Sequence, residues 1–390
     1  MRLKVLGISL AVLGASCCAG QPDRIDKVTE NGVEVVLNHE TPYRLKSEQS
    51  KLTLEKVLTI DTEQDATATL GLTDIFLFDV GLAGDVYILV PPTGPRDCIY
   101  KFSPEGKLLA TFGRLGQGPN ELEYPSDIQA LDNGEIWVFE SPKDKFHVFD
   151  VEGQPLAERS PLKFDSLTPL ANQNYLVSRL DASDLTAKYL PFVMELYDSQ
   201  FHTVKELDRF TKYANRTIYE QVPEAYVSGV GFSFQGKASR DRVYIGNSDR
   251  GYEILVYDLE GRLIRKIRKA YSPIRVSDEY KTKYLKDYLQ FMPDYAKKIY
   301  FPNDWHPFHA LFLDEEGRLF VMTYEPGENP GDFVYDIFNK DGVLISRRSL
   351  NAAHGGNGQL LARVRGDRLY AIQEKPSGFK QLVVFKMIWQ

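Results

Sequence analysis

One four-residue turn recurs along this 390-residue chain and restricts its possible folds more than any other feature. An Asp, Asn or Ser begins the turn and a Gly ends it, in the copies at residues 103–106, 150–153, 258–261 and 339–342. Residues 198–201 are a degenerate copy, and every copy follows a strand-like segment with aromatic residues. Glycine supplies the positive φ that tight turns require, so a strand before such a turn indicates a β-hairpin. The sequence therefore predicts an all-β fold of repeated hairpins.

A second turn precedes another set of strands. It occurs at residues 132–134 and 314–317, with weaker copies at 81–84, 172–174, 240–242 and 365–368. Six such hairpins predict a six-bladed β-propeller of four-stranded blades, with five or seven blades as the alternatives. The last blade, ending at residues 382–388, has no fourth strand of its own. We expect the spare strand at residues 51–60 to complete it and to close the ring.

The clearest copy of the repeat spans residues 112–156, where strands are predicted at residues 126–131, 135–140 and 145–150 and a fourth after Gly153. Its markers are Phe112-Gly113, Gly116, Gly118, Pro125, Asp132-Asn133-Gly134, Ile136-Trp137-Val138 and Phe149-Asp150. This segment resembles an NHL-type repeat. From about Lys51 onward, and loosely again in residues 301–321, the chain resembles the six-bladed, NHL-like propeller lipoproteins of bacterial cell envelopes. Families of this shape mostly bind proteins, peptides or glycans.

One insertion, at about residues 277–300, interrupts the repeat between the fourth and fifth blades. Ser277 is a suitable helix cap, and acidic residues follow it in the first turn. Tyr280, Tyr284 and Tyr288 fall at helical spacing, which indicates a packed face more than a binding surface. A second short helix is predicted over residues 294–300.

The first 16 residues have the composition of a bacterial lipoprotein signal peptide. A basic start precedes an apolar stretch at residues 5–14, which is too short to span a bilayer as a helix. The small residues before Cys17 resemble a lipoprotein cleavage site, which makes Cys17 the expected lipidated residue. Because Leu13 stands one place earlier than that pattern prefers, ordinary cleavage near Gly20 is the alternative. The resemblance implies a lipid-anchored envelope protein, and the lack of Asp directly after Cys17 favours the outer membrane on either of its sides.

These features divide the chain into three parts. Residues 1–16 are the signal peptide, and residues 17–50 are a tether that contains a small hairpin at residues 27–37. Residues 51–390 form the propeller. An isolated two-stranded hairpin is not stable in water, so we expect it to rest on the propeller.

Composition narrows the class of function. The formal net charge is −7 and no basic run stands out, which argues against nucleic-acid binding. Cys17 and Cys18 precede the propeller, so Cys98 has no disulfide partner there and is expected to be a buried strand residue rather than a catalytic thiol. The sequence lacks a Gly-x-Ser-x-Gly elbow, a phosphate loop and a zincin motif. We predict no cofactor, no nucleic-acid partner, a monomer, and membrane contact through the lipid anchor only.

The two faces of the predicted propeller carry unequal loops. First-to-second and third-to-fourth turns share one face, here called the tight-turn face. Second-to-third loops and blade-to-blade connections share the other, the crossover face, which receives nearly all the long loops. Since long loops on a rigid scaffold are the usual place for binding, we expect the ligand site there, between residues 113–125 and 277–309. The candidate ligand-binding residues are Arg114, Gln117, Glu121, Tyr124, Trp305, His306 and His309.

Each group of candidates has a structural alternative. The four polar residues of the first loop are also suited to holding that loop by hydrogen bonds. His306 and His309 are only two potential metal ligands, and a zinc site needs three or four, with His354 as the one further candidate. The sequence therefore favours a binding module for a protein, peptide or glycan over an enzyme. The alternative is a metal-dependent lyase or lactonase, because NHL-related propellers include such enzymes with ligands at the channel mouth.

Overall fold

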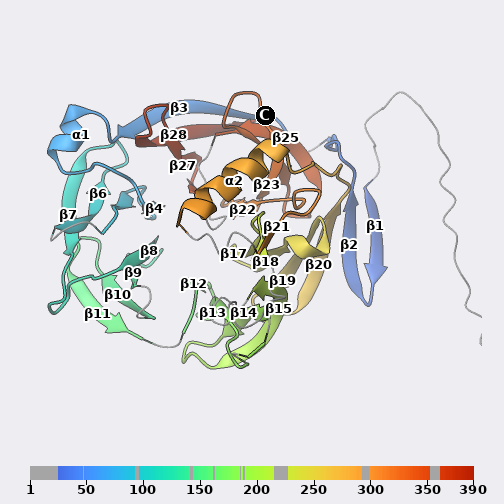
Figure 1. The fold of residues 1–390 in the computed structure, drawn as a ribbon, viewed down its shortest axis with the longest axis horizontal. Helices are drawn as coiled ribbons and strands as arrows, with labels where there is room; N and C mark the ends of the chain where they lie inside the picture. The colour runs from blue at the N-terminus through green and yellow to red at the C-terminus, as the bar shows by residue number, and fades with distance from the viewer. Residues whose placement is uncertain are drawn as a thin grey trace, which may run out of the picture.

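Six β-sheets stand around a common centre in the structure, a computed structural model (Figure 1). It describes residues 25–46, 48–92, 96–140, 144–160, 163–184, 186–187, 189–214, 227–291, 298–351 and 361–390. Within these residues five sheets have four strands, the sixth has six, and one further pair of strands lies apart. The chain is therefore the predicted six-bladed propeller, and the signal peptide with Cys17 lies outside the described residues.

Consecutive segments of the chain form consecutive antiparallel blades. Blades 1 to 3 consist of β4 (Leu77–Val80), β5 (Val86–Leu89), β6 (Asp97–Phe102), β7 (Leu108–Arg114), β8 (Pro125–Ala130), β9 (Ile136–Glu140), β10 (Lys145–Phe149), β11 (Pro155–Arg159), β12 (Ser166–Pro169), β13 (Tyr175–Leu180), β14 (Tyr189–Tyr197) and β15 (Thr203–Ala214). Blades 4 to 6 consist of β17 (Phe234–Ala238), β18 (Arg242–Asn247), β19 (Glu253–Asp258), β20 (Leu263–Lys269), β22 (Ala310–Leu313), β23 (Leu319–Pro326), β24 (Phe333–Phe338), β25 (Leu344–Leu350), β26 (Ala362–Arg365), β27 (Arg368–Glu374), β28 (Lys380–Trp389) and β3 (Leu52–Asp61).

The recurrent turn is explained by its own hydrogen bonds. In the copy after β10, Asp150 Oδ1 accepts from the backbone N–H groups of Glu152 at 3.0 Å and Gln154 at 2.8 Å. Gly153 has a φ of +82°, and a Cβ there would lie 2.4 Å from the Phe112 ring. Because the first side chain of the turn is occupied by backbone donors, its bonds hold the turn itself together. The same two acceptor bonds recur at Ser103, Asp198, Asp258, Asp314 and Asn339.

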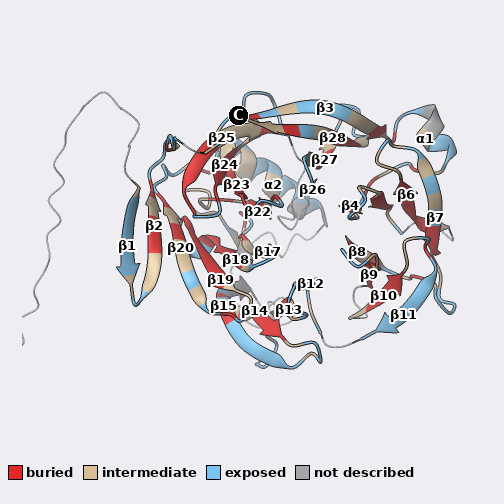
Figure 2. Ribbon diagram, turned by 180° about the vertical axis from the view of Figure 1, so that it is seen from behind, coloured by how far each residue is buried: buried red, intermediate tan, exposed pale blue. Residues whose placement is uncertain are grey.

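The hydrophobic core is divided among the boundaries between neighbouring blades. Each large cluster combines side chains from adjacent blades, as when Trp137 stacks on Phe146 at 4.5 Å beside Tyr175 of the next blade. The middle strands are therefore buried on both faces, whereas an outer strand such as β11 is exposed throughout (Figure 2). Burying apolar surface on both faces of each blade is what holds the ring together.

The ring closes through the N-terminal strand, as predicted. β3 pairs antiparallel with β28 from Leu52↔Trp389 to Asp61↔Gln381, so it is the outer strand of blade 6. Leu52 and Ile60 are buried there. This pairing satisfies the edge of β28 that would otherwise be open.

The N-terminal hairpin is an integral part of blade 4. β1 (Asp26–Glu30) pairs with β2 (Val33–Asn38), and β2 pairs in parallel with β20, which makes the sheet six-stranded. Val35 and Val36 are fully buried, and Asn38 donates to the carbonyl of Gly342 in blade 5 at 2.9 Å. The expectation that the hairpin rests on the propeller is confirmed, and the contact is more extensive than a tether requires.

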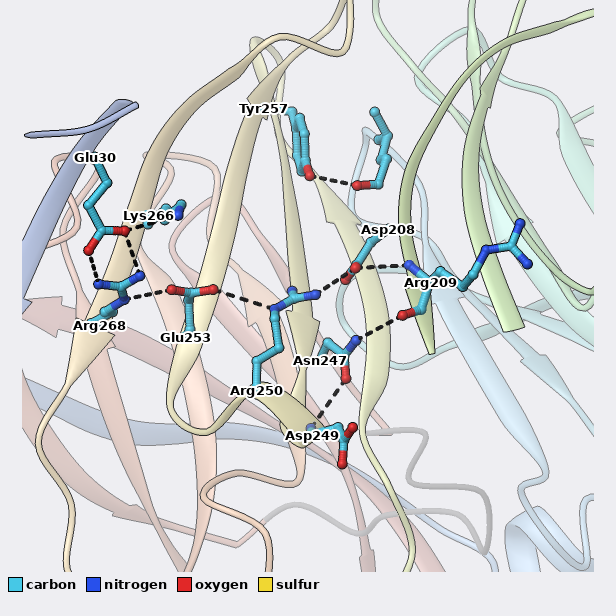
Figure 3. A network of polar contacts seen from close by, with 11 residues as sticks. Glu30, Asp208, Arg209, Asn247, Asp249, Arg250, Glu253, Tyr257, Lys266 and Arg268 are labelled. Carbon is cyan, nitrogen blue, oxygen red and sulfur yellow. Dashed lines mark hydrogen bonds and ion pairs between the residues drawn. The ribbon is translucent and has the colours of Figure 1, made fainter. Parts of the chain in front are cut away.

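A chain of ion pairs continues this attachment across blade 4 (Figure 3). Arg268 on β20 binds Glu30 at the end of β1 and Glu253 on β19, at 2.5 and 2.6 Å. Arg250, in the short helix η1 (Ser248–Arg250), lies 3.4 Å from Glu253 and 2.5 Å from Asp208 on β15 of blade 3. Held by Arg268 and Lys266, the Glu30 carboxyl has a pKa of about 2. The hairpin, blade 4 and blade 3 are thus linked by alternating charges.

The insertion contains the predicted helix α2 (Asp278–Phe291), which Ser277 caps by accepting from the Tyr280 N–H at 3.1 Å. The second predicted helix is wrong where it can be compared. Ile299–Tyr300 is a strand, β21, which pairs in parallel with β16 (Val227–Ser228). Extended pairing outside the insertion overrides the weak local helix pattern. A five-residue helix not expected from the sequence, α1 (Asp65–Thr69), lies in the loop after β3.

Among the described residues, no helix is both long and apolar enough to cross a membrane.

Candidate functional site

The first predicted loop, which connects blade 1 to blade 2, is held by its own polar residues. Arg114 lies 3.5 Å from Glu121, whose other oxygen accepts from the Gly118 N–H at 2.8 Å. Gln117 donates to Glu123 at 3.1 Å. These bonds fold the loop back on itself, which is the structural alternative for its polar residues. The side chain of Arg114 is 67% exposed and Tyr124 is 52% exposed, and Gln117 is exposed as well.

A buried carboxylate that the sequence did not single out anchors the end of this loop. Glu140, the last residue of β9, accepts from the backbone N–H groups of Glu123 and Tyr124 and lies 2.9 Å from His147 Nε2. The Lys145 ammonium is 3.1 Å away. Although burial opposes ionisation, the hydrogen bonds from His147 and the two backbone groups hold the pKa of Glu140 at about 2. The sequence does contain a signal for this site, because Glu140 is the one charged residue in the otherwise apolar strand β9.

A narrow cleft lies on the crossover face at the boundary between blades 4 and 5. It is about 10 Å³, room for one water molecule. Two of the predicted residues, Trp305 and His306, line it. The other lining residues are Tyr252, Lys269, Tyr271, Ser272, Ile274, Pro307, Thr323 and Glu325.

The floor of this cleft is a fully bonded ionic network. Asp336, with no exposed surface, lies 3.2 Å from Lys269 Nζ and accepts from the Tyr252 hydroxyl and from Arg347 Nε, both at 2.7 Å. Burial, together with the neighbouring Asp336 carboxylate, raises the pKa of Tyr252 well above its ordinary value. Because Lys269, Tyr252 and Arg347 all bond to Asp336, the network holds the cleft floor in place.

One wall of the cleft is an aromatic stack. Trp305 stacks on Tyr324 at 4.5 Å between ring centroids, and His309 stacks on the same ring at 5.2 Å. Tyr280 of α2 meets the Trp305 ring edge to face at 4.6 Å. Tyr280 and Tyr284 thus pack as predicted, while the side chain of Tyr288 lies outside the described residues. His309 belongs to the stack and does not line the cleft. Of the seven predicted ligand-binding residues, Trp305 and His306 are therefore the two that line it.

The predicted residues therefore occupy two places and not one. The loop after β7 lies at blades 1 and 2, whereas Tyr280 of α2 packs on Trp305 at the boundary between blades 4 and 5. The rest of α2 runs in front of blade 5 toward the centre of the ring (Figure 1). α2 is in front of the ring in Figure 1 and behind it in Figure 2, so it lies on the crossover face.

Two further hypotheses from the sequence concern a metal site at the histidines and a catalytic role for Cys98. Within the described residues, no three His, Cys, Asp or Glu side chains are placed to hold one metal ion. His354 lies outside those residues. Cys98 is fully buried and donates to the Gly113 carbonyl at 2.9 Å, and burial raises the pKa of its thiol to about 12. It is the structural strand residue that was expected.

A second cavity, of about 270 Å³, lies on the tight-turn face between blades 6 and 1. It is shallow, and its two arginines are engaged: Arg365 with Asp132 and Glu315, and Arg368 with the Pro104 carbonyl. Sequence reasoning missed it because turns from three separate blades form it. Its lining is Leu82, Ala83, Gly84, Pro104, Glu315, Arg365, Gly366, Asp367, Arg368 and Tyr370.

Fold comparison places the chain among six-bladed β-propellers. A protein from Bacteroides fragilis, provisionally described as exported, matches with a TM-score of 0.52 at 12% identity, over 91% of this chain and 99% of that one. A member of the DUF4221 family from Bacteroides vulgatus matches with a TM-score of 0.50 at 16% identity, over 88% and 99%. At these identities the likeness defines the fold alone. No protein-family model and no curated protein matches the chain.

Proposed function

We propose that this chain is a binding module of the bacterial cell envelope, an NHL-like propeller lipoprotein that recognises a protein, peptide or glycan on its crossover face. The observation that carries the proposal is the cleft between blades 4 and 5. It combines a rigid charged floor with exposed groups of several kinds. Tyr271 is 38% exposed, and the Glu325 side chain is 40% exposed.

The chemistry of the cleft suits recognition of one projecting group of a larger ligand. Trp305 and Tyr271 offer aromatic surface, His306 and Ser272 offer polar groups, and Glu325 accepts hydrogen bonds. An aromatic ring beside a carboxylate is suited to a sugar ring or a peptide side chain. The cleft is too small for an entire ligand, so most of the contact area would come from the surrounding loops.

The experiment is a glycan array and a peptide library screened with the mature chain carrying Cys17→Ala, followed by calorimetry on each hit. Trp305→Ala should weaken binding at least tenfold, since truncated aromatic anchors carry a large share of binding energy. His306→Ala should have a smaller effect. Tyr124→Ala tests whether the loop across the ring takes part. Glu152→Ala, in an exposed turn of the tight-turn face, is the control.

The opposite pattern would place the site elsewhere. Hits that are insensitive to Trp305→Ala and Tyr124→Ala but sensitive to Arg368→Ala would move recognition to the tight-turn face. Metal analysis of the purified protein with a lactone and ester screen tests the enzymatic alternative.

Lipidation of Cys17 and an outer-membrane location belong to the same proposal. The support is the small-residue run before Cys17, after a basic and apolar leader. Mass spectrometry of the native N-terminus and membrane fractionation test both statements. We expect a monomer, which sedimentation measures.

A further inference from the structure

The central channel of the propeller contains charges that the fold does not pair. The first strands of the blades line it (Figure 1): β4 contacts β8 and β26, and β22 contacts β17 and β26. Four charged residues on four of these strands influence one another electrostatically: Asp79 on β4, Asp127 on β8, Lys237 on β17 and Arg363 on β26. Each is partly reached by solvent.

Two of these charged residues, Arg363 and Asp79, form an ion pair between blades. Arg363 Nε lies 3.1 Å from Asp79 Oδ1, and Asp79 Oδ2 accepts from the Ala130 N–H at 2.8 Å. These bonds tie blade 6 to blade 1 and blade 1 to blade 2. Arg363 Nη1 donates to the Ala362 carbonyl at 3.0 Å. Nη2 of Arg363 donates to no group in the part of the chain that the structure describes, so one face of this guanidinium remains available.

Among the residues that the structure describes, the other two charges have no ionic partner. Across the described ranges, Lys237 Nζ forms no hydrogen bond or ion pair. Among the described residues, Asp127 accepts from neutral groups of its own strand, Gln129 Nε2 at 3.3 Å and the Ile128 N–H. Desolvation lowers the pKa of Lys237 to about 8 and raises that of Asp127. Unpaired charge with restricted access to water is costly for a fold, and such groups are frequent in functional sites.

The far end of the channel is bridged. Arg365, two residues after Arg363 on β26, reaches Asp132 of blade 2 at 2.9 Å and Glu315 of blade 5 at 3.5 Å. It also donates twice to the Val80 carbonyl of blade 1. One side chain thus connects four blades at the tight-turn face. Arg365 therefore lies across the tight-turn end of the channel.

We propose that this channel binds a small carboxylate that carries a hydroxyl or ammonium group beside it. Lys237 and Nη2 of Arg363 hold the carboxylate, and Asp127 accepts from the neighbouring group. Two cationic donors near one acceptor match this pairing of functional groups, which sugar acids and α-amino acids share. The channel site is separate from the cleft between blades 4 and 5 and does not depend on the function proposed for that cleft.

Calorimetry with the mature chain carrying Cys17→Ala tests the proposal. The probes are galacturonate and glucuronate as sugar acids, and glycine and alanine as amino acids. Galactose, which lacks the carboxylate, and acetate, which lacks the neighbouring hydroxyl or ammonium group, are the control ligands. At least one acid should bind, and Lys237→Met should weaken that binding at least tenfold, whereas Lys237→Arg should retain most of it. Lys56→Met, which removes an exposed lysine of the outer strand β3, is the matched control. Which acid binds distinguishes a sugar-acid site from an amino-acid site.

Two further readouts separate a ligand site from a structural one. Binding should weaken as pH rises past about 8, where Lys237 loses its charge; Asp79, Asp127 and Arg363 are the charged groups that face it. Without ligand, Lys237→Met should leave the melting temperature unchanged or raise it. The proposal is overturned if none of the four acids binds. It is equally overturned if Lys237→Met binds as well as the parent, or if that variant melts at a clearly lower temperature, the result for a water-bridged structural pair.

Discussion

Replacing Glu140 with Gln should destabilise the protein in a pH-dependent way. The Glu140 pKa is about 2, against an ordinary value of 4.5, because His147 and the N–H groups of Glu123 and Tyr124 favour the carboxylate. That difference corresponds to about 3 kcal/mol of extra stability for the charged form. Since the folded-state pKa is lowered, this stability is fully present above pH 4.5 and is lost as pH falls toward 2. Glu140→Gln should therefore cost about 3 kcal/mol at pH 7 and roughly half of that at pH 3.

Urea unfolding of both proteins at pH 7, 5, 4 and 3 measures the difference. Glu158→Gln is the control, because this partner of the same cluster is half exposed and should change the free energy of unfolding by less than about 0.5 kcal/mol. Either of two results would refute the reasoning. One is a cost for Glu140→Gln that stays constant from pH 7 to pH 3, and the other is a cost at pH 7 no larger than that of the control.

Three shorter predictions follow from the fold and the anchor. Deleting residues 51–60 should lower the melting temperature and the cooperativity of unfolding, since it leaves the β28 edge open, and deleting residues 18–50 should lower the melting temperature by less. A strand deletion that melts at the same temperature as the full-length chain would contradict closure. Gly153→Ala should cost about 2 kcal/mol in urea unfolding, because Gly153 has a φ of +82° and an added Cβ would lie 2.4 Å from the Phe112 ring; a neutral result would contradict the turn geometry. Cys17→Ala should release the protein from the membrane fraction, and retention there would contradict lipidation.

Features that depend on neighbouring residues could be predicted from the sequence. The turn at residues 150–153 is an example, because Asp150 bonds to N–H groups two and four residues later and Gly153 supplies the positive φ. The helix cap at Ser277 is another. Counting such signals gave the number of blades, and the missing fourth strand of the last blade assigned β3 to it. The degenerate turn was recognisable although Phe201, with a φ of +62°, replaces its glycine.

The candidate site was predictable only in part, because sequence separation conceals which loops meet. Trp305 and His306 do line a cleft, but its other residues come from β19, β20 and β23 and the segments beside them. Arg114, Gln117 and Glu121 have the residue types of a binding loop, yet their bonds are internal to the loop. The sequence shows which side chains can form hydrogen bonds or ion pairs. Which group each of them bonds to depends on the fold.

The sequence by itself determined the blade strands, the turns between them and the closure of this propeller, because each depends on residues within a few positions or on a simple count. The tertiary structure alone decided which charges are paired. Asp79 and Arg363, 284 positions apart, meet across blades, whereas Lys237 and Asp127 reach the same channel without an ionic partner in the described chain. The physical reason is that a charge is stabilised by the atoms within a few ångströms of it, and a closed ring gathers those atoms from the whole length of the chain.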